Sequence, residues 1–253
     1  MDNPALGEIP GDSILITCEH GGNRVPPMYQ YLFQGWEMLL DSHRGYDAGA
    51  LELATRMARR FGAPLICATT SRLLIDLNRS PGHPALYSEV TRRAPLALRS
   101  QLFEEQYLPY RNRVEDWATT TVASGCRAIH ISCHSFTPQL NGQTRNTDLG
   151  LLYDPSRQEE QRLCRQWQIA MKQGHAQFTT RRNYPYVGKS DCLAAYLRRR
   201  LPDTSYVGLE LEINQKHLLG NQRHWPALQQ AVIETLNGVL RLRKDILEET
   251  VGA

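Results

Sequence analysis

The sequence lacks the features of a membrane-bound or exported protein. No hydrophobic run approaches the roughly 20 residues that a helix needs to cross a bilayer. The N-terminus, Met1 to Pro4, has neither the basic head nor the apolar core of a secretory signal peptide. The six cysteines are scattered without a CxxC pair, a pattern typical of free, mostly buried thiols. We therefore expect a cytoplasmic protein with no membrane contact.

The sequence also has little net charge and no nucleotide-binding motif. Its 29 Lys and Arg against 26 Asp and Glu leave a formal charge of +3, which is too small to indicate a nucleic-acid partner. The arginine-rich stretch at residues 198–200 is better explained as a solvated helix face. Neither GxxxxGK(S/T) nor GxGxxG occurs, which disfavours a nucleotide-binding enzyme.

The hydrophobic content of 41% and charged content of 22% are those of an ordinary globular protein. No repeat, low-complexity tract or Gly/Ser linker divides the chain, so residues 1–253 are expected to form a single domain. Apolar runs predict strands at residues 13–18, 65–69, 73–77, 128–133, 149–153 and 206–213. Helical periodicity predicts helices at residues 49–61, 95–122 with an interruption near Pro109, 157–178, 191–201 and 225–247. Strands separated by helices predict a sandwiched α/β sheet.

Polar side chains gather where the predicted strands end. His20 follows the first strand, residues 76–79 close the third, and His134 closes the fourth. The last strand carries Glu210 and Glu212. If these strands are parallel neighbours, their carboxyl ends bring all of these groups to one crevice, where α/β sheets bind ligands.

The two histidines are candidate metal ligands. A lone His20 could simply form a loop hydrogen bond, although Gly21 and Gly22 after it permit a close backbone approach to whatever it holds. Strand alternation places His130 and His134 on the same side. His130 is better explained as a core residue, whereas His134 at the strand exit is the better ligand.

Glu210 and Glu212 share one face of an otherwise apolar strand. Two carboxylates there are costly unless they face water, a cation or each other through a shared proton. Two imidazoles and a carboxylate with one position open for water form the typical catalytic zinc site. A further carboxylate beside that water would serve as the general base.

The segment after the third predicted strand suggests a site for a substrate carboxylate. Arg79 could be an ordinary surface charge, but beside a metal site its forked donors suit a carboxylate, with Asn78 next to it. Asp76 lies on the same predicted strand face as Asn78 and could orient Arg72 or Arg79. Arg145 is a second candidate for holding an anion.

These segments, in this order, resemble the N-formylglutamate amidohydrolase family from about residue 14 to residue 217. The matching motifs are HGG at residues 20–22, VP at 25–26, DAGA at 47–50, SRLLIDLNR at 71–79, HSF at 134–136 and LEINQ at 211–215. The 71–79 segment is the most specific of them. The late glutamate, the histidine after a strand and the DxNR motif are more distantly similar to zinc carboxypeptidases and aspartoacylases.

The resemblance implies a three-layer α/β/α sandwich around a mixed, mostly parallel sheet. It also implies a zinc-dependent amidohydrolase that cleaves the formamide of N-formyl-L-glutamate to formate and glutamate, in histidine breakdown. The expected partner is therefore a small N-acyl amino acid. The expected cofactor is zinc, although cobalt, manganese or iron also suits such ligands. The oligomeric state is left open.

Carried onto this sequence, the resemblance assigns zinc binding to His20 and His134 and water activation to Glu212. It assigns binding of the substrate's α-carboxylate to Asn78 and Arg79. We further predict that Arg72 and Tyr186 bind substrate, the latter from a loop that resembles a substrate-side loop of the family. Arg145 is predicted to take part in catalysis.

The third metal ligand requires a choice. Carboxypeptidase-like enzymes use HxxE, but the corresponding residue here is Asn23, a poor zinc ligand. Glu19 would point away from the site if the first strand continued through it. Asp47, just before the first long helix, is therefore our prediction.

Two departures from the family pattern put the substrate in doubt. Arg111 follows Pro-Tyr where relatives often have a histidine, and residues 189–191 are Lys-Ser-Asp where glycine is common. The alternatives are thus an exopeptidase or a deacylase of a different N-acyl amino acid on the same site. A non-catalytic amino-acid-binding relative is the further alternative.

Overall fold

The central element is a six-stranded sheet in the order β2-β1-β3-β8-β6-β7. The computed structural model describes residues 11–219 and 224–251. The strands are β1 (Asp12–Cys18), β2 (Leu65–Cys67), β3 (Arg127–Phe136), β6 (Leu149–Leu152), β7 (Thr180–Arg182) and β8 (Tyr206–Asn214). Strands β2, β1, β3 and β8 run parallel, whereas β6 is antiparallel to β8 and parallel to β7. The sheet is therefore mixed and mostly parallel, as predicted.

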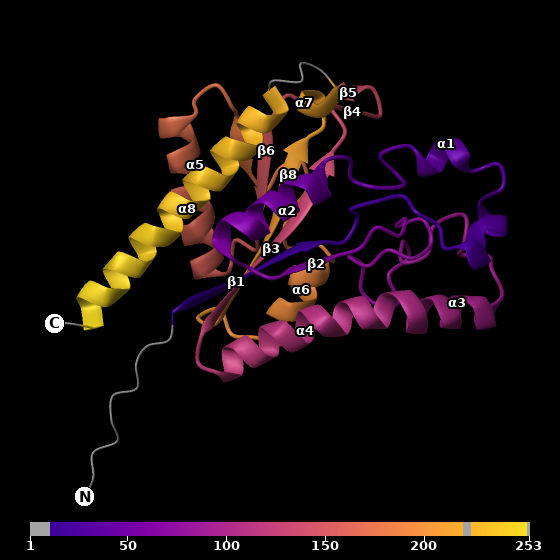
Figure 1. Ribbon diagram of the computed structural model, residues 1–253, viewed down its shortest axis with the longest axis horizontal. Coiled ribbons are helices and arrows are strands. Elements are labelled where there is room, and N and C mark those ends of the chain that lie inside the picture. The colour runs from indigo at the N-terminus through magenta and orange to yellow at the C-terminus, as the bar shows by residue number, and fades with distance from the viewer. Residues whose placement is uncertain (1–10, 220–223, 252–253) are drawn as a thin grey trace, which may run out of the picture.

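Helices cover both faces of this sheet (Figure 1). They are η1 (Pro27–Phe33), α1 (Glu37–Leu40), α2 (Ala50–Phe61), α3 (Leu96–Leu102), η2 (Phe103–Tyr107), α4 (Leu108–Ala123), α5 (Gln158–Gly174), α6 (Leu193–Arg198), α7 (Lys216–Leu219) and α8 (His224–Val251). Residues of α2, α5 and α8 share one core cluster with the sheet, and residues of α4 and α6 share another. The predicted three-layer α/β/α sandwich is confirmed.

Strand alternation sorts the side chains between these two layers. On β3 and β8 one set of alternate residues packs against α2, α5 and α8, namely Ile129, Ile131, Cys133, Leu209, Leu211 and Ile213. Ala128 and Tyr206, at the starts of the same strands, pack on the α4 and α6 side. His130, Ser132, His134, Glu210 and Glu212 alternate with the apolar set, so they also face the α4 and α6 side.

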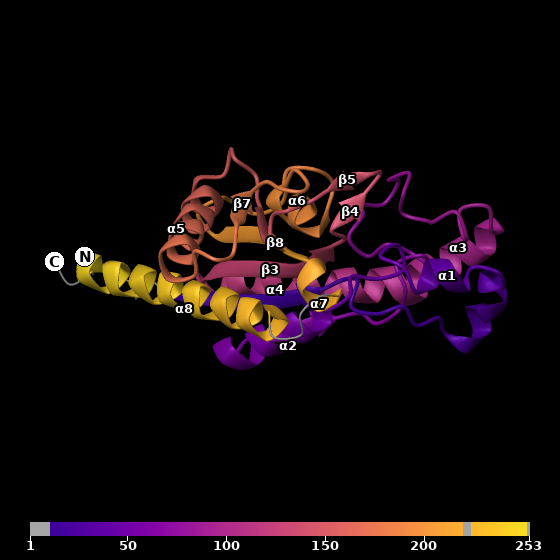
Figure 2. The same ribbon diagram turned by 90° about the horizontal axis from the view of Figure 1, so that it is seen from above.

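A small lobe made of η1, α1 and α3 lies away from the sheet, at the end of the molecule opposite the C-terminal end of α8 (Figures 1 and 2). Its own apolar cluster consists of Tyr29, Phe33, Leu73, Leu74 and Leu102. The two short strands β4 (Gln139–Leu140) and β5 (Gln143–Thr144) form a separate antiparallel hairpin.

The strand predicted at residues 73–77 is wrong, because this segment is a series of turns. Side chains bind some of its carbonyls, and turn and loop backbone groups bind other parts of its backbone, in place of a neighbouring strand. Ser88 Oγ donates to the carbonyl of Leu73 at 2.5 Å, and Thr91 Oγ1 donates to the carbonyl of Leu74 at 2.9 Å. The apolar run reflects burial of these leucines in the lobe.

The helix predicted at residues 95–122 is continuous, but its hydrogen-bond pattern changes before Pro109. Residues Phe103–Tyr107 form a π-helical turn, and Pro109 lies in the first turn of α4. Proline has no N–H to donate, so the regular α-helical hydrogen-bond pattern cannot pass through Pro109, and the π-helical turn lies just before it.

The described residues also bear on the expectations about membrane spans and cysteines. Within residues 11–219 and 224–251, no helix combines the length and apolar character of a membrane span. All six cysteines are free, and Cys18, Cys133, Cys164 and Cys192 are buried, as expected. Met1 to Pro4, the segment that bears on an export signal, lies outside the described residues.

Candidate functional site

A pocket of about 570 Å³ opens at the carboxyl ends of β1, β3 and β8. All of the predicted site residues except Arg145 line it, namely His20, Asp47, Arg72, Asn78, Arg79, His134, Tyr186 and Glu212. The convergence expected from parallel strands therefore occurs, although residues 76–79 arrive from a loop instead of a strand.

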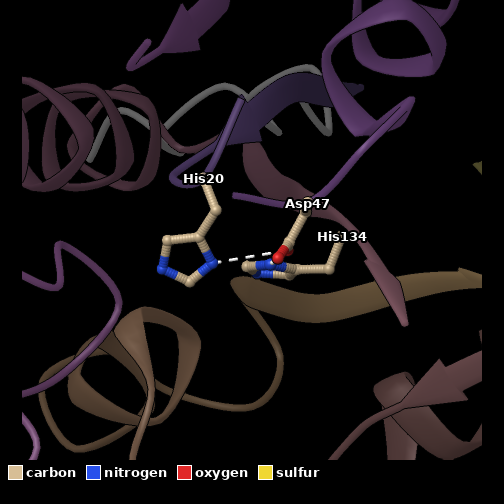
Figure 3. A group of neighbouring side chains, drawn as sticks. All are labelled: His20, Asp47 and His134. Carbon is tan, nitrogen blue, oxygen red and sulfur yellow. Dashed lines mark hydrogen bonds and ion pairs between the residues drawn. The ribbon is translucent and has the colours of Figure 1, made fainter. Parts of the chain in front are cut away.

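His20, Asp47 and His134 form a compact group deep in this pocket. One candidate ligand atom from each lies within 4.8 Å of the others. Asp47 Oδ2 is 3.4 Å from His20 Nδ1 and 2.8 Å from His134 Nδ1. Figure 3 shows both imidazoles approaching the carboxylate of Asp47. Two imidazoles and one carboxylate that converge in this way match the donor set of catalytic zinc.

The end of β1 sets the direction of His20. The strand stops at Cys18, and Glu19 and His20 lie in a turn. The expectation that Glu19 points away is wrong, because it continues the alternation of β1 and lies 3.4 Å from His134 Nε2. The turn redirects His20 to the same side, where its carbonyl accepts from the Asp47 N–H at 2.9 Å.

Gly21 and Gly22 serve a different purpose from the one expected. A Cβ at Gly21 would lie 2.9 Å from the carbonyl oxygen of Ala68, and one at Gly22 would lie 2.7 Å from that of Thr69. Glycine therefore lets this turn pass close to the chain that follows β2, and the glycines do not face the pocket cluster.

The Nε2 atom of each histidine, on the other side of the ring from the Nδ1 that approaches Asp47, has a partner of its own. His20 Nε2 is 2.8 Å from Asp76 Oδ1, and Arg72 Nη2 donates to Asp76 Oδ2 at 2.7 Å. His134 Nε2 is 2.8 Å from Ser132 Oγ. Such outer contacts orient metal-ligating histidines, and here they leave both Nδ1 atoms directed toward Asp47.

The charges of this group depend strongly on one another. Burial alone would raise the pKa of Asp47, but His20 and His134 outweigh it and lower that pKa well below its usual range. Burial alone would lower the pKa of His134, but the bond to Asp47 outweighs it and raises the pKa to about 10. The proton on His134 thus lies where a cation would replace it, and metal binding to such a site releases protons.

Glu210 and Glu212 both line the pocket, as predicted, but they differ in their hydrogen bonds. Glu210 Oε1 accepts from Asn78 Nδ2 at 2.8 Å. Glu212 is buried, and its Oε2 has no hydrogen-bond partner among the described residues. Burial, together with the charges of Asp47 and Glu210, raises the pKa of Glu212 to about 8. Glu212 is therefore a buried carboxylate of this pocket that combines an unpartnered oxygen with a raised pKa.

The sequence profile of the N-formylglutamate amidohydrolase family matches residues 12–219. The chain belongs to this family. Members of the family are amidohydrolases, so this protein is an enzyme that hydrolyses an amide in a small molecule.

Two solved structures agree with this assignment at the level of the fold. A gene product of Agrobacterium tumefaciens is 26% identical, with a TM-score of 0.76 over 92% of each chain. An N-formylglutamate amidohydrolase of Ralstonia eutropha is 19% identical, with a TM-score of 0.66 over 95% of this chain and 97% of its own. A metallo-carboxypeptidase of Burkholderia cenocepacia is 16% identical, with a TM-score of 0.39 over 96% of this chain and 60% of its own. No curated protein matched significantly.

One wall of the pocket contains Arg79, whose guanidinium is only partly engaged. Arg79 Nη1 donates to the carbonyl of Asp191 at 2.6 Å, and its Nε is buried without a partner among the described residues. Asn78, by contrast, uses both ends of its amide, since Oδ1 also accepts from the Leu193 N–H at 2.8 Å. Arg72 is similarly engaged by Asp76.

Tyr186 lines the pocket, and Arg145 lies against Tyr186 outside the lining. Arg145 Nη1 donates to the Tyr186 hydroxyl at 3.3 Å, and its guanidinium lies over the Tyr186 ring, 5.4 Å from the centroid. Asn214 Nδ2 donates to the carbonyl of Arg145 at 2.7 Å and so holds its backbone. Arg145 itself does not line the pocket.

Two further pocket residues were missed as site candidates. His43 lies at the mouth, and burial together with Arg44 and Arg145 lowers its pKa. Asp191 lies in the wall, where its Oδ2 accepts from the Ser80 N–H at 2.8 Å. Asp191 belongs to the segment in which this chain departs from its family, and that departure could have drawn attention to it. The other departure, Arg111, does not line the pocket.

Proposed function

We propose that this enzyme hydrolyses the N-acyl amide of an acidic N-acyl amino acid, with N-formyl-L-glutamate as the expected substrate. The observation that carries the proposal is the buried Glu212, which has an unpartnered oxygen in the same pocket as His20, Asp47 and His134. A carboxylate with a raised pKa beside a set of metal donors is the arrangement that metal-assisted hydrolysis requires.

We further propose that His20, Asp47 and His134 hold one divalent cation, with zinc as the expected ion. The donor set and the converging Nδ1 atoms support this. Cobalt, manganese or iron would accept the same ligands. When bound, the ion would act as a Lewis acid that makes water more acidic and polarises the amide carbonyl.

Glu212 is the proposed general base and general acid. In its ionised form it accepts a proton from the water whose oxygen forms the new bond to the acyl carbon. It then donates this proton to the amide nitrogen as the C–N bond breaks, giving a carboxylic acid and a free amine. A pKa near 8 suits both steps, because the group must gain and lose the same proton near neutral pH.

Arg79 is the proposed holder of the α-carboxylate, since it lines the pocket and its guanidinium has more donors than the one that binds the Asp191 carbonyl. Asn78 and Arg72 line the same wall, and their polar groups are already used to hold Glu210 and Asp76. Arg145, with Tyr186, is the proposed donor to the substrate's second carboxylate or to the oxyanion that forms during attack.

One observation favours a second candidate substrate. Asp191 adds a carboxylate to the pocket wall, and a like charge disfavours an acidic side chain nearby. An N-acyl amino acid with a neutral side chain is therefore the alternative substrate of the same site.

For either substrate, the pocket is built from segments near both ends and the middle of the sequence, which supports a single domain.

The experiment is metal analysis of the purified protein coupled to formate release from N-formyl-L-glutamate. N-formylglutamine and N-acetylglutamate are tested beside it, because each changes only the side chain or only the acyl group. Glu212→Gln is the matched control. We expect about one metal ion per chain and formate release that the control lacks. A metal-loaded enzyme that cleaves only N-formylglutamine would favour the alternative, and one that cleaves no N-acyl amino acid would contradict the proposal.

A further inference from the structure

A row of buried polar side chains runs behind the proposed metal ligand His134. Its members come from β1, β3 and β8 and the turn after β1, and they are Tyr206, His130, Thr17, Glu19, Ser132 and His134. At one end, His130 lies 2.8 Å from the Tyr206 hydroxyl and 2.9 Å from Thr17 Oγ1. At the other end, Ser132 Oγ lies 2.5 Å from Glu19 Oε2 and 2.8 Å from His134 Nε2.

Glu19 is the member that requires an explanation. It has no exposed surface, and neither the proposed hydrolysis nor the metal ligand set uses it. Besides Ser132, its hydrogen-bond partners include the Tyr110 hydroxyl at 2.9 Å and the Thr17 hydroxyl. Within the part of the chain that the structure describes, its ion-pair partner is His134 and no Lys or Arg contacts it. A buried carboxylate without a guanidinium or ammonium is costly, so such a group needs a function.

The hydrogen-bond directions connect Glu19 to His134. An ionised carboxylate can only accept, so the single hydroxyl proton of Ser132 is donated to Glu19. The oxygen of Ser132 is then left to accept a hydrogen bond, and the N–H that faces it is the one on His134 Nε2. Protonation at Nε2 leaves the lone pair of Nδ1 for a metal, on the side where Figure 3 shows Asp47 and His20.

His20 is held differently, which makes the role of Glu19 testable. Its Nε2 faces Asp76 directly, and Arg72 neutralises that carboxylate. At His134 a hydroxyl intervenes, and no guanidinium shares the charge of Glu19. The negative charge of Glu19 therefore acts on the imidazoles of His134 and His130, and of these two only His134 is a proposed metal ligand.

We propose that Glu19, through Ser132, is a positioning residue that holds His134 as its Nε2–H tautomer and compensates its charge when a cation is bound. The inference rests on the proposed function, because His134 must be a metal ligand for the positioning to matter. It predicts that the Glu19–Ser132 pair sets the affinity of the site for a divalent cation without touching that cation.

The test measures the dissociation constant for zinc by competition with a chelator, in the full-length protein. Glu19→Gln and Ser132→Ala break the link to His134 at its two ends. Tyr206→Phe is the matched control, because it removes a buried hydroxyl from the far end of the same row. Thermal unfolding of each metal-free variant reports whether it folds.

We expect Glu19→Gln and Ser132→Ala to weaken zinc binding about 10- to 100-fold, as loss of an outer partner of a metal-bound histidine does. Tyr206→Phe should bind zinc like the wild type. Wild-type zinc affinity in both Glu19→Gln and Ser132→Ala would overturn this inference and leave the proposed metal site standing. Equal weakening in all three would overturn it by showing a general loss of packing. A wild-type protein that binds no zinc would remove the proposed metal site and this inference with it. Should Glu19→Gln fail to fold, Ser132→Ala decides.

Discussion

The two faces of the central sheet differ in the chemistry of the side chains that they bury. Toward α2, α5 and α8, the strands β3 and β8 present mainly apolar side chains, with Arg127 and Ser135 near the two ends of β3 as the polar exceptions. Toward α4 and α6, the same strands present His130, Ser132, His134, Glu210 and Glu212, all of them buried. One face is a layer of hydrophobic packing, and the other is a polar surface that ends at the pocket.

This difference shows how one strand serves stability and chemistry together. Because neighbouring residues point to opposite faces, Leu211 and Glu212 are adjacent in sequence but lie in different environments. The apolar face supplies the burial that stabilises the sheet, so the other face can hold buried charges close together. The two faces should therefore respond differently to substitution.

The largest effect is expected on the polar face, at Glu212. Glu212→Gln removes the proposed base and should lower kcat about 10²- to 10⁴-fold while metal content and KM change little. Steady-state kinetics with N-formyl-L-glutamate, together with metal analysis, measure this. Glu210→Gln is the comparison on the same face, because Glu210 is already bonded to Asn78, and it should cost less. Substantial turnover by Glu212→Gln would defeat the assignment.

On the apolar face, Leu211→Ala should act on stability alone. Leu211 is fully buried, and its truncation should lower the free energy of unfolding by about 2–5 kcal/mol. Below the unfolding temperature, kcat should remain close to the wild-type value. Denaturant unfolding and kinetics on the same preparation check both halves. A large loss of kcat with unchanged stability would mean that the two faces are not separate in function.

The polar face should also make stability depend on pH through His130. Burial lowers the pKa of His130 from 6.5 to about 4, so the folded protein keeps this ring neutral. Below pH 6.5 the unfolded chain binds a proton that the folded chain does not. This contribution is present in full above that pH and is lost as the pH falls toward 4, amounting to about 3 kcal/mol at about 1.4 kcal/mol per pKa unit.

His130→Gln isolates this contribution. Urea unfolding of the wild type and the variant at several pH values should give curves that converge on acidification, because the variant lacks the titrating group. Parallel curves would show that His130 does not titrate between the two states.

The smallest effect is expected at the pocket wall, at Arg79. Arg79→Ala should raise KM by about 10-fold or somewhat more, since a hydrogen bond to a charged group contributes about 1.5–3 kcal/mol. Because this grip is present before the reaction starts, kcat should change little. Arg199→Ala is the control, being an exposed arginine nearby that does not line the pocket. An unchanged KM in Arg79→Ala would move the carboxylate site elsewhere.

Much of this architecture is readable from the sequence because alternation in a strand is a local property. The alternation of Ile131 and Cys133 with Ser132 and His134 predicts which side chains share a face. Parallel strands then bring His20, His134 and Glu212 to one edge of the sheet. Asp47 could be placed there only through the family resemblance, since nothing in its local pattern connects it with the two histidines.

The parts that were predicted incorrectly depend on contacts between distant segments. The run at residues 73–77 has the composition of a strand, but Ser88 and Thr91 bind two of its carbonyls and no strand pairs with it. Glu19 was expected to point away because a strand that continued to His20 would place these neighbours on opposite faces, but the strand ends at Cys18 and the turn after it brings both side chains to one side. The engagement of Asn78 by Glu210 across the pocket likewise has no local signal.

The central claim is that both histidines and Asp47 hold one divalent cation through the Nδ1 atoms of the imidazoles. Anomalous diffraction at the zinc edge, from crystals of the zinc-loaded protein, tests it most directly. The account predicts a single strong peak about 2.0–2.2 Å from His20 Nδ1, His134 Nδ1 and an oxygen of Asp47. A peak bound through Nε2, or no peak among these three residues, would contradict it.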